Sequence, residues 1–107
     1  YPHVDVLVGF LKAATGWDIT VEEILKTGER IGTLRHLFNL REGLNPLTYS
    51  VSGRITGAPP AKEGPLAGVT IDEESVNREF LEAMDWDLKT TRPSQQKLRY
   101  LGLDEIA

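Results

Sequence analysis

Hydrophobic residues recur along much of the chain at spacings of three and four, the pattern of amphipathic helices. The clearest case begins at Thr20, which with Glu23 has the spacing of a capping box, where each side chain bonds the other's backbone N–H. Gly43 is a natural stop, so we expect a helix of about 22 residues, roughly 33 Å long. One side of it carries an apolar stripe: Val21, Ile24, Leu25, Gly28, Ile31, Leu34, Leu37 and Phe38.

Three further helices are expected on either side of this one. Residues 4–14 are apolar almost all round, which predicts a buried helix, and Gly16 can end it. Ser94 can cap a short helix that runs through Leu101 and is closed by Gly102. Asp72 can cap another helix, whose predicted buried side is Val76, Phe80, Leu81 and Met84.

The periodicity is lost between residues 44 and 71. This stretch is broken by Pro46, Gly53, Gly57, Pro59, Pro60, Gly64, Pro65 and Gly68. Long irregular segments are uncommon inside compact domains. Its scattered apolar residues favour a strap lying along a partner surface over a flexible linker. The predicted fold class is therefore all-α: a small orthogonal helical domain of about four helices with a long irregular strap (residues 44–71).

Composition narrows the class of protein. A chain of 107 residues makes one domain, 1–107, and its 40% hydrophobic and 26% charged residues are typical of soluble proteins. The net charge of −4 argues against a nucleic-acid partner, which usually meets a basic face. No apolar run approaches the roughly 18 residues of a membrane span, so no membrane partner is expected.

The absence of cysteine excludes disulfides, zinc–thiolate sites and iron–sulfur ligation within these residues. It favours an intracellular, cytoplasmic location. The chain opens at Tyr1 without an initiator methionine, and its only methionine is Met84. We therefore expect a piece of a longer protein.

The two histidines do not form a recognisable metal site. A carboxylate-bridged site in a helical bundle needs Glu three residues before His, but Thr33 occupies that position relative to His36. We interpret His36 as a surface or interface residue, and His3 carries little information. A carboxylate metal protein that depends on His36 stays as a third hypothesis.

Two other features of the long helix have a structural interpretation. Gly28 and Gly32 lie four residues apart and predict close approach of another backbone, since glycine costs a helix about 1 kcal/mol. Four arginines are expected to pair with acidic residues or donate to carbonyls of the strap: Arg30, Arg35, Arg41 and Arg54. We name no catalytic, cofactor-binding or metal-binding residue. The residues alone fit a helical domain that expects a neighbour, or a free-standing helical protein-interaction module.

The order of short motifs resembles a known family, the C-terminal domain of tungsten-containing aldehyde:ferredoxin oxidoreductases. The resemblance covers nearly the whole chain. It is carried by Ala14-Thr15-Gly16-Trp17-Asp18, Gly28-Glu29-Arg30-Ile31, Phe38-Asn39, Arg41-Glu42-Gly43, Gly64-Pro65-Leu66-Ala67-Gly68, Trp86-Asp87 and Leu101-Gly102-Leu103. One departure is Gly32, where family members commonly carry a bulky residue.

The resemblance implies a parent enzyme that oxidises aldehydes to carboxylic acids. It would use a tungsten (or molybdenum) bis-pterin centre and a four-iron iron–sulfur cluster, and would pass electrons to ferredoxin. The family's cofactor ligands lie upstream of the matching region, so this chain is expected to hold no cofactor and to be inactive alone. Its expected partner is the upstream domains of the same polypeptide.

Overall fold

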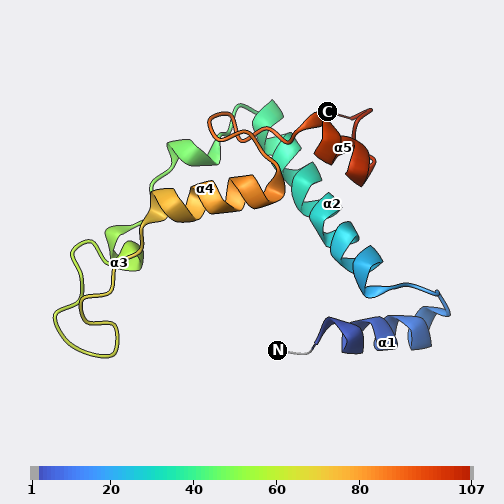
Figure 1. The fold of residues 1–107 in the computed structure, drawn as a ribbon, viewed down its shortest axis with the longest axis horizontal. Helices are drawn as coiled ribbons and strands as arrows, with labels where there is room; N and C mark the ends of the chain where they lie inside the picture. Colours follow the sequence, from blue (N-terminus) through green and yellow to red (C-terminus); the bar gives the residue numbers. More distant parts are fainter. Residues whose placement is uncertain (1–2, 107) are drawn as a thin grey trace.

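The computed structural model describes residues 3–106, and their regular structure is helical (Figure 1). The elements are α1 (Val4–Thr15), α2 (Val21–Arg41), the 3₁₀ turn η1 (Pro46–Thr48), α3 (Gly53–Thr56), α4 (Glu73–Met84) and α5 (Gln95–Leu101). No sheet forms within the described residues, where two isolated bridges are the β-type pairings. The all-α prediction is confirmed.

The helices begin where the capping residues predict. The Thr20 hydroxyl accepts from the Glu23 N–H at 3.1 Å, and the Thr20 N–H donates to the Glu23 carboxylate at 2.7 Å. Asp72 and Ser94 cap α4 and α5 in the same way, each accepting from the backbone N–H three residues on. These contacts satisfy backbone donors that the first turn of a helix leaves free. Local sequence therefore fixes the helix starts.

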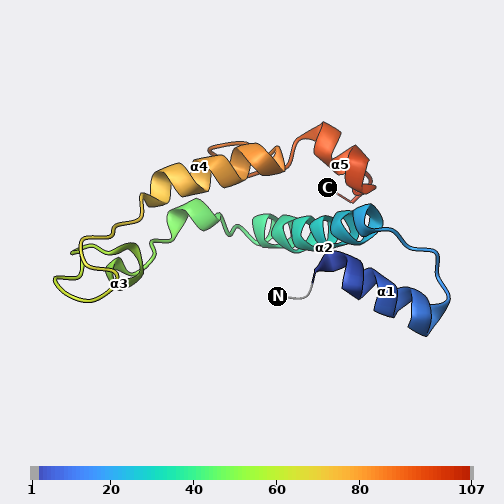
Figure 2. The same cartoon turned by 60° about the horizontal axis from the view of Figure 1, so that its bottom comes forward.

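Helix α2 is the central element. It contacts α1 near one part of its length and α5 near another. Figures 1 and 2 show α4 leading away from this group toward a lobe formed by α3 and the loop that follows it. The molecule is elongated, with extents of 53 × 34 × 21 Å.

The hydrophobic core is small for a chain of this length. Leu98, Leu101 and Leu103 form it, and Leu37 of α2 packs against them. The radius of gyration is 18.2 Å, against about 13 Å for a compact chain of this size. The accessible surface of 8514 Å² exceeds that of a compact monomer of the same mass by about 2,500 Å². Much apolar surface is therefore left uncovered.

Two predictions of burial are wrong within this chain. Helix α1 was expected to be buried all round, but only Val8 is buried, and Phe10 is 69% exposed. On α4 only Leu81 is buried, while Val76 and Phe80 are about half exposed. The helices form as expected, but other parts of the described chain cover these faces only in part.

The segment of residues 44–71 is irregular, as predicted, apart from η1 and the single turn of α3. Its second half folds on itself: the Ile71 N–H donates to the Thr56 carbonyl at 2.8 Å, and the Gly68 N–H to the Ala61 carbonyl at 2.9 Å. Gly57 has φ +74°, and a Cβ there would come 2.3 Å from the Val69 carbonyl oxygen. We call residues 53–71 the lobe. Its apolar side chains are exposed.

Candidate interaction site

One side of α2 is joined to the C-terminal part of the chain by polar contacts, and we call it the inner face: Glu29, Arg30, Thr33, His36 and Leu37. The Arg30 Nε donates to the Leu101 carbonyl at 2.7 Å, beside the end of α5. The Glu29 carboxylate accepts from Lys97 Nζ at 2.5 Å, and this ion pair is largely shielded from solvent. A charged donor on a free helix-end carbonyl is a favourable contact. The inner face therefore fixes α5 on α2.

His36 lies at the centre of a second set of contacts on the inner face. Its ring stacks on the Trp86 indole with centroids 4.1 Å apart, and Phe80 meets the same indole edge-on at 5.8 Å. The His36 Nε2 lies 2.8 Å from the Thr91 carbonyl oxygen, in hydrogen-bonding distance. His36 is buried. The prediction of a surface histidine is wrong, whereas an interface role, between α2 and the 85–94 turn, is what the structure shows.

The 85–94 turn is held by its own backbone and by Asp87. The Trp86 and Pro93 backbones pair as an isolated antiparallel bridge. The Asp87 carboxylate accepts from the Thr90 N–H at 2.7 Å and from the Lys89 N–H at 3.0 Å. These bonds, with the Thr90 N–H first, hold the pKa of Asp87 below its ordinary value. Ionised Asp87 thus stabilises the turn that positions Trp86 and Thr91.

The opposite side of α2 is apolar and open to solvent. We call this the outer face: Ile31, Leu34 and Phe38, all of them exposed. They belong to the predicted apolar stripe, of which only Leu37, at its edge, packs on the core. An exposed apolar face of this extent marks an interaction surface. Within the described chain the inner face packs against α5, whereas the outer face is covered only in part, where Leu34 and Phe38 line an open hollow with Arg92 and Ile106.

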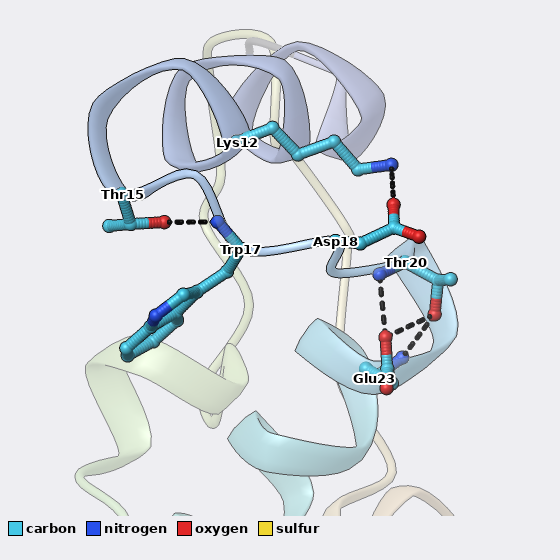
Figure 3. Close-up of polar contacts among 6 residues, drawn as sticks. All are labelled: Lys12, Thr15, Trp17, Asp18, Thr20 and Glu23. Atoms are coloured by element: carbon cyan, nitrogen blue, oxygen red, sulfur yellow. Dashed lines mark hydrogen bonds and ion pairs between the residues drawn. The ribbon is translucent and has the colours of Figure 1, made fainter.

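The connection between α1 and α2 is polar and partly rigid (Figure 3). Lys12 Nζ donates to the Asp18 carboxylate at 2.8 Å, and this bond lowers the pKa of Asp18. The Thr15 hydroxyl accepts from the Trp17 N–H at 3.2 Å. In Figure 3 the Trp17 ring points away from the Lys12–Asp18 pair, and this side chain is 68% exposed. Trp17 thus adds to the uncovered apolar surface.

The predictions for the glycines and for the arginines of α2 and the strap have different outcomes. A Cβ at Gly28 or Gly32 would meet nothing within 4 Å, so no other backbone among residues 3–106 approaches these two glycines. Among the arginines, Arg30 does donate to a carbonyl, but to Leu101 rather than to the strap, and Arg41 pairs with Glu42 at 3.3 Å. No contact of Arg35 or Arg54 with an acid is formed in the described part.

The described residues were also compared with the requirements of a metal site. Residues 3–106 contain no cluster of three or more His, Asp or Glu side chains placed to hold a metal ion. The chain has no cysteine to ligate a cluster. Its residues therefore do not fit a tungsten or iron–sulfur site. Sequence reasoning also missed Thr33 and Thr91 as buried residues, although the run Arg30, Thr33, His36 at three-residue spacing signals a helix face of its own.

The geometry is thus that of a helical segment with a small core and much exposed apolar surface. The chain belongs to the family described as "Aldehyde ferredoxin oxidoreductase, domains 2 & 3", whose model matches residues 1–103. It is 36% identical over 96 residues to a tungsten-containing aldehyde ferredoxin oxidoreductase of Pyrococcus abyssi, covering 90% of this chain. It is 34% identical over 102 residues to the enzyme of the same name from Pyrococcus horikoshii, covering 95% of this chain.

The match is to a part of those proteins. The aligned region makes up 16% of the Pyrococcus abyssi protein and 17% of the Pyrococcus horikoshii protein. No solved structure matches the chain significantly. Within residues 3–106, no helix has both the length and the apolar character needed to cross a membrane.

Proposed function

We propose that residues 1–107 are a single C-terminal helical domain of an aldehyde:ferredoxin oxidoreductase-like enzyme. The domain packs on the cofactor-bearing domains, stabilises them and helps to wall the substrate channel, and does none of the chemistry itself. The observation that carries this proposal is the exposed outer face of α2. Its apolar residues Ile31, Leu34 and Phe38 follow helical spacing, and the described chain leaves each of them at least 42% exposed.

The size of the uncovered surface supports an intramolecular partner. The excess of about 2,500 Å² over a compact monomer is enough to supply one side of an obligate interface, since such interfaces bury roughly 2,000–5,000 Å² summed over both partners. The matched relatives are about six times longer than the aligned region, so they carry enough polypeptide to cover such a surface. A weak, transient module would not need so large an apolar area.

The parent enzyme would oxidise an aldehyde to a carboxylic acid in the cytoplasm and pass the electrons to ferredoxin. We assign its tungsten (or molybdenum) bis-pterin centre and four-iron cluster to residues outside this chain. The family match and the tungsten-containing relatives support the assignment of the parent. The lack of a ligand set in the described residues supports the placement of the cofactors elsewhere.

The test compares the activity and metal content of the isolated chain with those of its full-length parent. The purified 107-residue chain is incubated with an aldehyde and a viologen dye and is analysed for metals. We expect no dye reduction and no stoichiometric tungsten or iron, whereas the full-length parent shows both. Turnover or bound metal in the chain alone would refute the structural role.

The gene gives a second test. We expect the reading frame to continue for several hundred codons upstream of Tyr1, with cysteines at Cys-x-x-x-Cys-type spacing. A start codon directly before Tyr1 would instead support the free-standing interaction module.

A further inference from the structure

A hollow opens at the edge of the outer face, between the last turns of α2, the 85–94 turn and the segment that follows α5. It measures about 340 Å³, and we call it the Arg92 hollow. Its apolar lining comes mainly from α2: Leu34, Leu37, Phe38 and Leu40. Arg41 and Arg92 are its charged lining residues, and none of the described residues that line it is acidic. The hollow thus combines an apolar lining with two cationic side chains.

The guanidinium of Arg92 has no counter-ion in the described structure. Its side chain is exposed, and none of the ion pairs within residues 3–106 involves it. The backbone of Arg92 is nevertheless fixed, because its carbonyl accepts from the Asp87 N–H at 2.8 Å. The next residue, Pro93, is buried and pairs with Trp86 across the turn. An ordered turn therefore holds this cation at the hollow.

Arg41 is only weakly neutralised. Its guanidinium lies 5.0 Å from the centroid of the Phe38 ring, and its Nε donates to the Glu42 carboxylate at 3.3 Å. The two side chains of that ion pair are 72% and 52% exposed. Ion pairs surrounded by water contribute little to stability. The described chain therefore offers one exposed carboxylate to the two guanidinium groups of the hollow.

Covering the outer face would change the solvation of both cations. Leu34 and Phe38 belong to the outer face and also line the hollow. Polypeptide that covers these two side chains would therefore withdraw water from the hollow as well. A charge taken out of water without a counter-ion is very unfavourable, and buried charges in proteins are paired. The covering segment must then bring a negative charge to this place.

We propose that the Arg92 hollow receives an aspartate or glutamate side chain from the part of the parent polypeptide outside residues 1–107. Its carboxylate pairs with Arg92, with Arg41 as the second cation, and an apolar neighbour in the same segment packs on Leu34 and Phe38. The inference rests on the proposed function and adds the chemistry of the partner surface to it. The aligned region is 16% of the first relative, so the remainder is long enough to supply such a segment.

Two observations favour a side chain of the parent over a free carboxylate. The hollow shares two residues with the outer face, and a small anion would leave Ile31 of that face 56% exposed. Both arginines are exposed in the described structure, and exposed guanidinium groups hold a small anion weakly because salt screens them. A carboxylate attached to the covering polypeptide is instead present at a high effective concentration.

The first experiment is zero-length crosslinking in the full-length parent. Arg92→Lys keeps the positive charge and supplies an amine, which a water-soluble carbodiimide couples to a carboxylate in contact with it. We expect a crosslink from position 92 to an aspartate or glutamate outside residues 1–107, identified by mass spectrometry of the digested protein. Arg35→Lys is the matched control, because Arg35 is an exposed arginine of α2 that does not line the hollow. It should not couple to the same acidic residue.

Crosslinks from position 92 only to acids within residues 1–107, such as Glu42 or Glu105, would overturn the proposal, and so would the absence of any crosslink. A benzoylphenylalanine in place of Ile31 separates that failure from a failure of the proposed function. If this probe still reaches peptides outside residues 1–107, the outer face is covered and only the acidic contact is wrong. If it reaches none, the proposed packing function fails as well.

The second experiment reverses the charges of the proposed pair in the full-length parent. Arg92→Glu should speed amide hydrogen exchange of residues 34–41 by about 10- to 100-fold, because repulsion replaces a charge-assisted contact. Changing the crosslinked acid to Arg in the same protein should restore most of the slow exchange. The same second change should not restore exchange in Arg35→Glu, which is the control. Exchange that stays fast in the Arg92→Glu double variant would overturn the ion pair. A fall in wild-type protection after exhaustive dialysis would also overturn it, since it would reveal a diffusible anion.

Discussion

The two faces of α2 differ in a way that reverses the usual rule for a surface helix. The inner face is rich in polar residues, yet it is the buried one and includes Thr33 and His36. The outer face is apolar, yet it is exposed, with Ile31 at 56%. Hydrophobic periodicity marks a face that must be covered. It does not say whether the cover comes from the same stretch of chain.

The inner face explains how so small a core holds together. Its contacts are specific rather than extensive: Arg30 with the Leu101 carbonyl, Glu29 with Lys97, and His36 with Trp86. Each of these contacts orients a loop or a helix end. Packing of the three core leucines alone would not fix that orientation. The outer face has no such polar contacts, and it suits a broad apolar interface in which packing provides the stability.

The largest effect is expected in the core behind the inner face. Leu101→Ala removes a fully buried side chain and should lower the free energy of unfolding of the 107-residue chain by about 2–5 kcal/mol. Urea unfolding followed by circular dichroism measures it. Leu66→Ala in the lobe is the control, because that side chain is exposed and should change stability by less than about 0.5 kcal/mol. Equal changes in the free energy of unfolding for the two variants would show that packing of the core leucines does not determine the stability of the chain.

The sharpest test of the difference between the faces is a charge on the outer one. In the full-length parent, Ile31→Asp would bury an unpaired carboxylate and should cost at least about 2 kcal/mol. In the 107-residue chain the same change is close to neutral, because Ile31 is exposed there. Thermal unfolding of both proteins compares them, with Glu82→Gln on α4 as a control in each. A neutral Ile31→Asp in the parent would show that the outer face stays in water.

Local signals predicted the helices well, and long-range signals predicted the contacts poorly. The capping residues Thr20, Asp72 and Ser94 act within one turn of their helices, so the sequence reveals their roles directly. The burial of His36 depends on Trp86 and Thr91, which are 50 and 55 residues away in the sequence. No periodicity encodes such a pairing. Helix α1 and the outer face stay exposed because no segment of the described chain packs fully over them.

The polar contacts of α2 can be tested by a pair of arginines, one with a contact and one without. Arg30→Met removes the donor to the Leu101 carbonyl and should cost the 107-residue chain about 1–2 kcal/mol. Arg35→Met changes the same side chain at a position with no polar contact in the described structure, and should be near neutral. Urea unfolding of both variants gives the comparison. Equal losses would mean that the Arg30 contact does not hold α5 in place.

A smaller effect is expected at the start of α2, before either face begins. Thr20→Ala removes the cap hydroxyl and should cost about 1 kcal/mol. Thr20→Ser keeps an acceptor at that place and should recover most of the loss. The helix content from circular dichroism and the unfolding midpoint report it. A loss that Ser does not recover would point to the methyl group rather than to the cap.

The smallest effect is expected from the carboxylate that orders the 85–94 turn behind the inner face. The pKa of Asp87 is lowered in the folded chain, so its ionised form contributes stability above the unfolded value of 3.8, and this is lost as the pH falls through the lower folded pKa. Because Asp87 is fully solvent-exposed, the effect should be slight. Unfolding midpoints measured between pH 6 and pH 2 should fall a little less in Asp87→Asn than in the wild type. An identical profile for Asp87→Asn would mean that the Thr90 and Lys89 donors hold the turn no better when the carboxylate is charged.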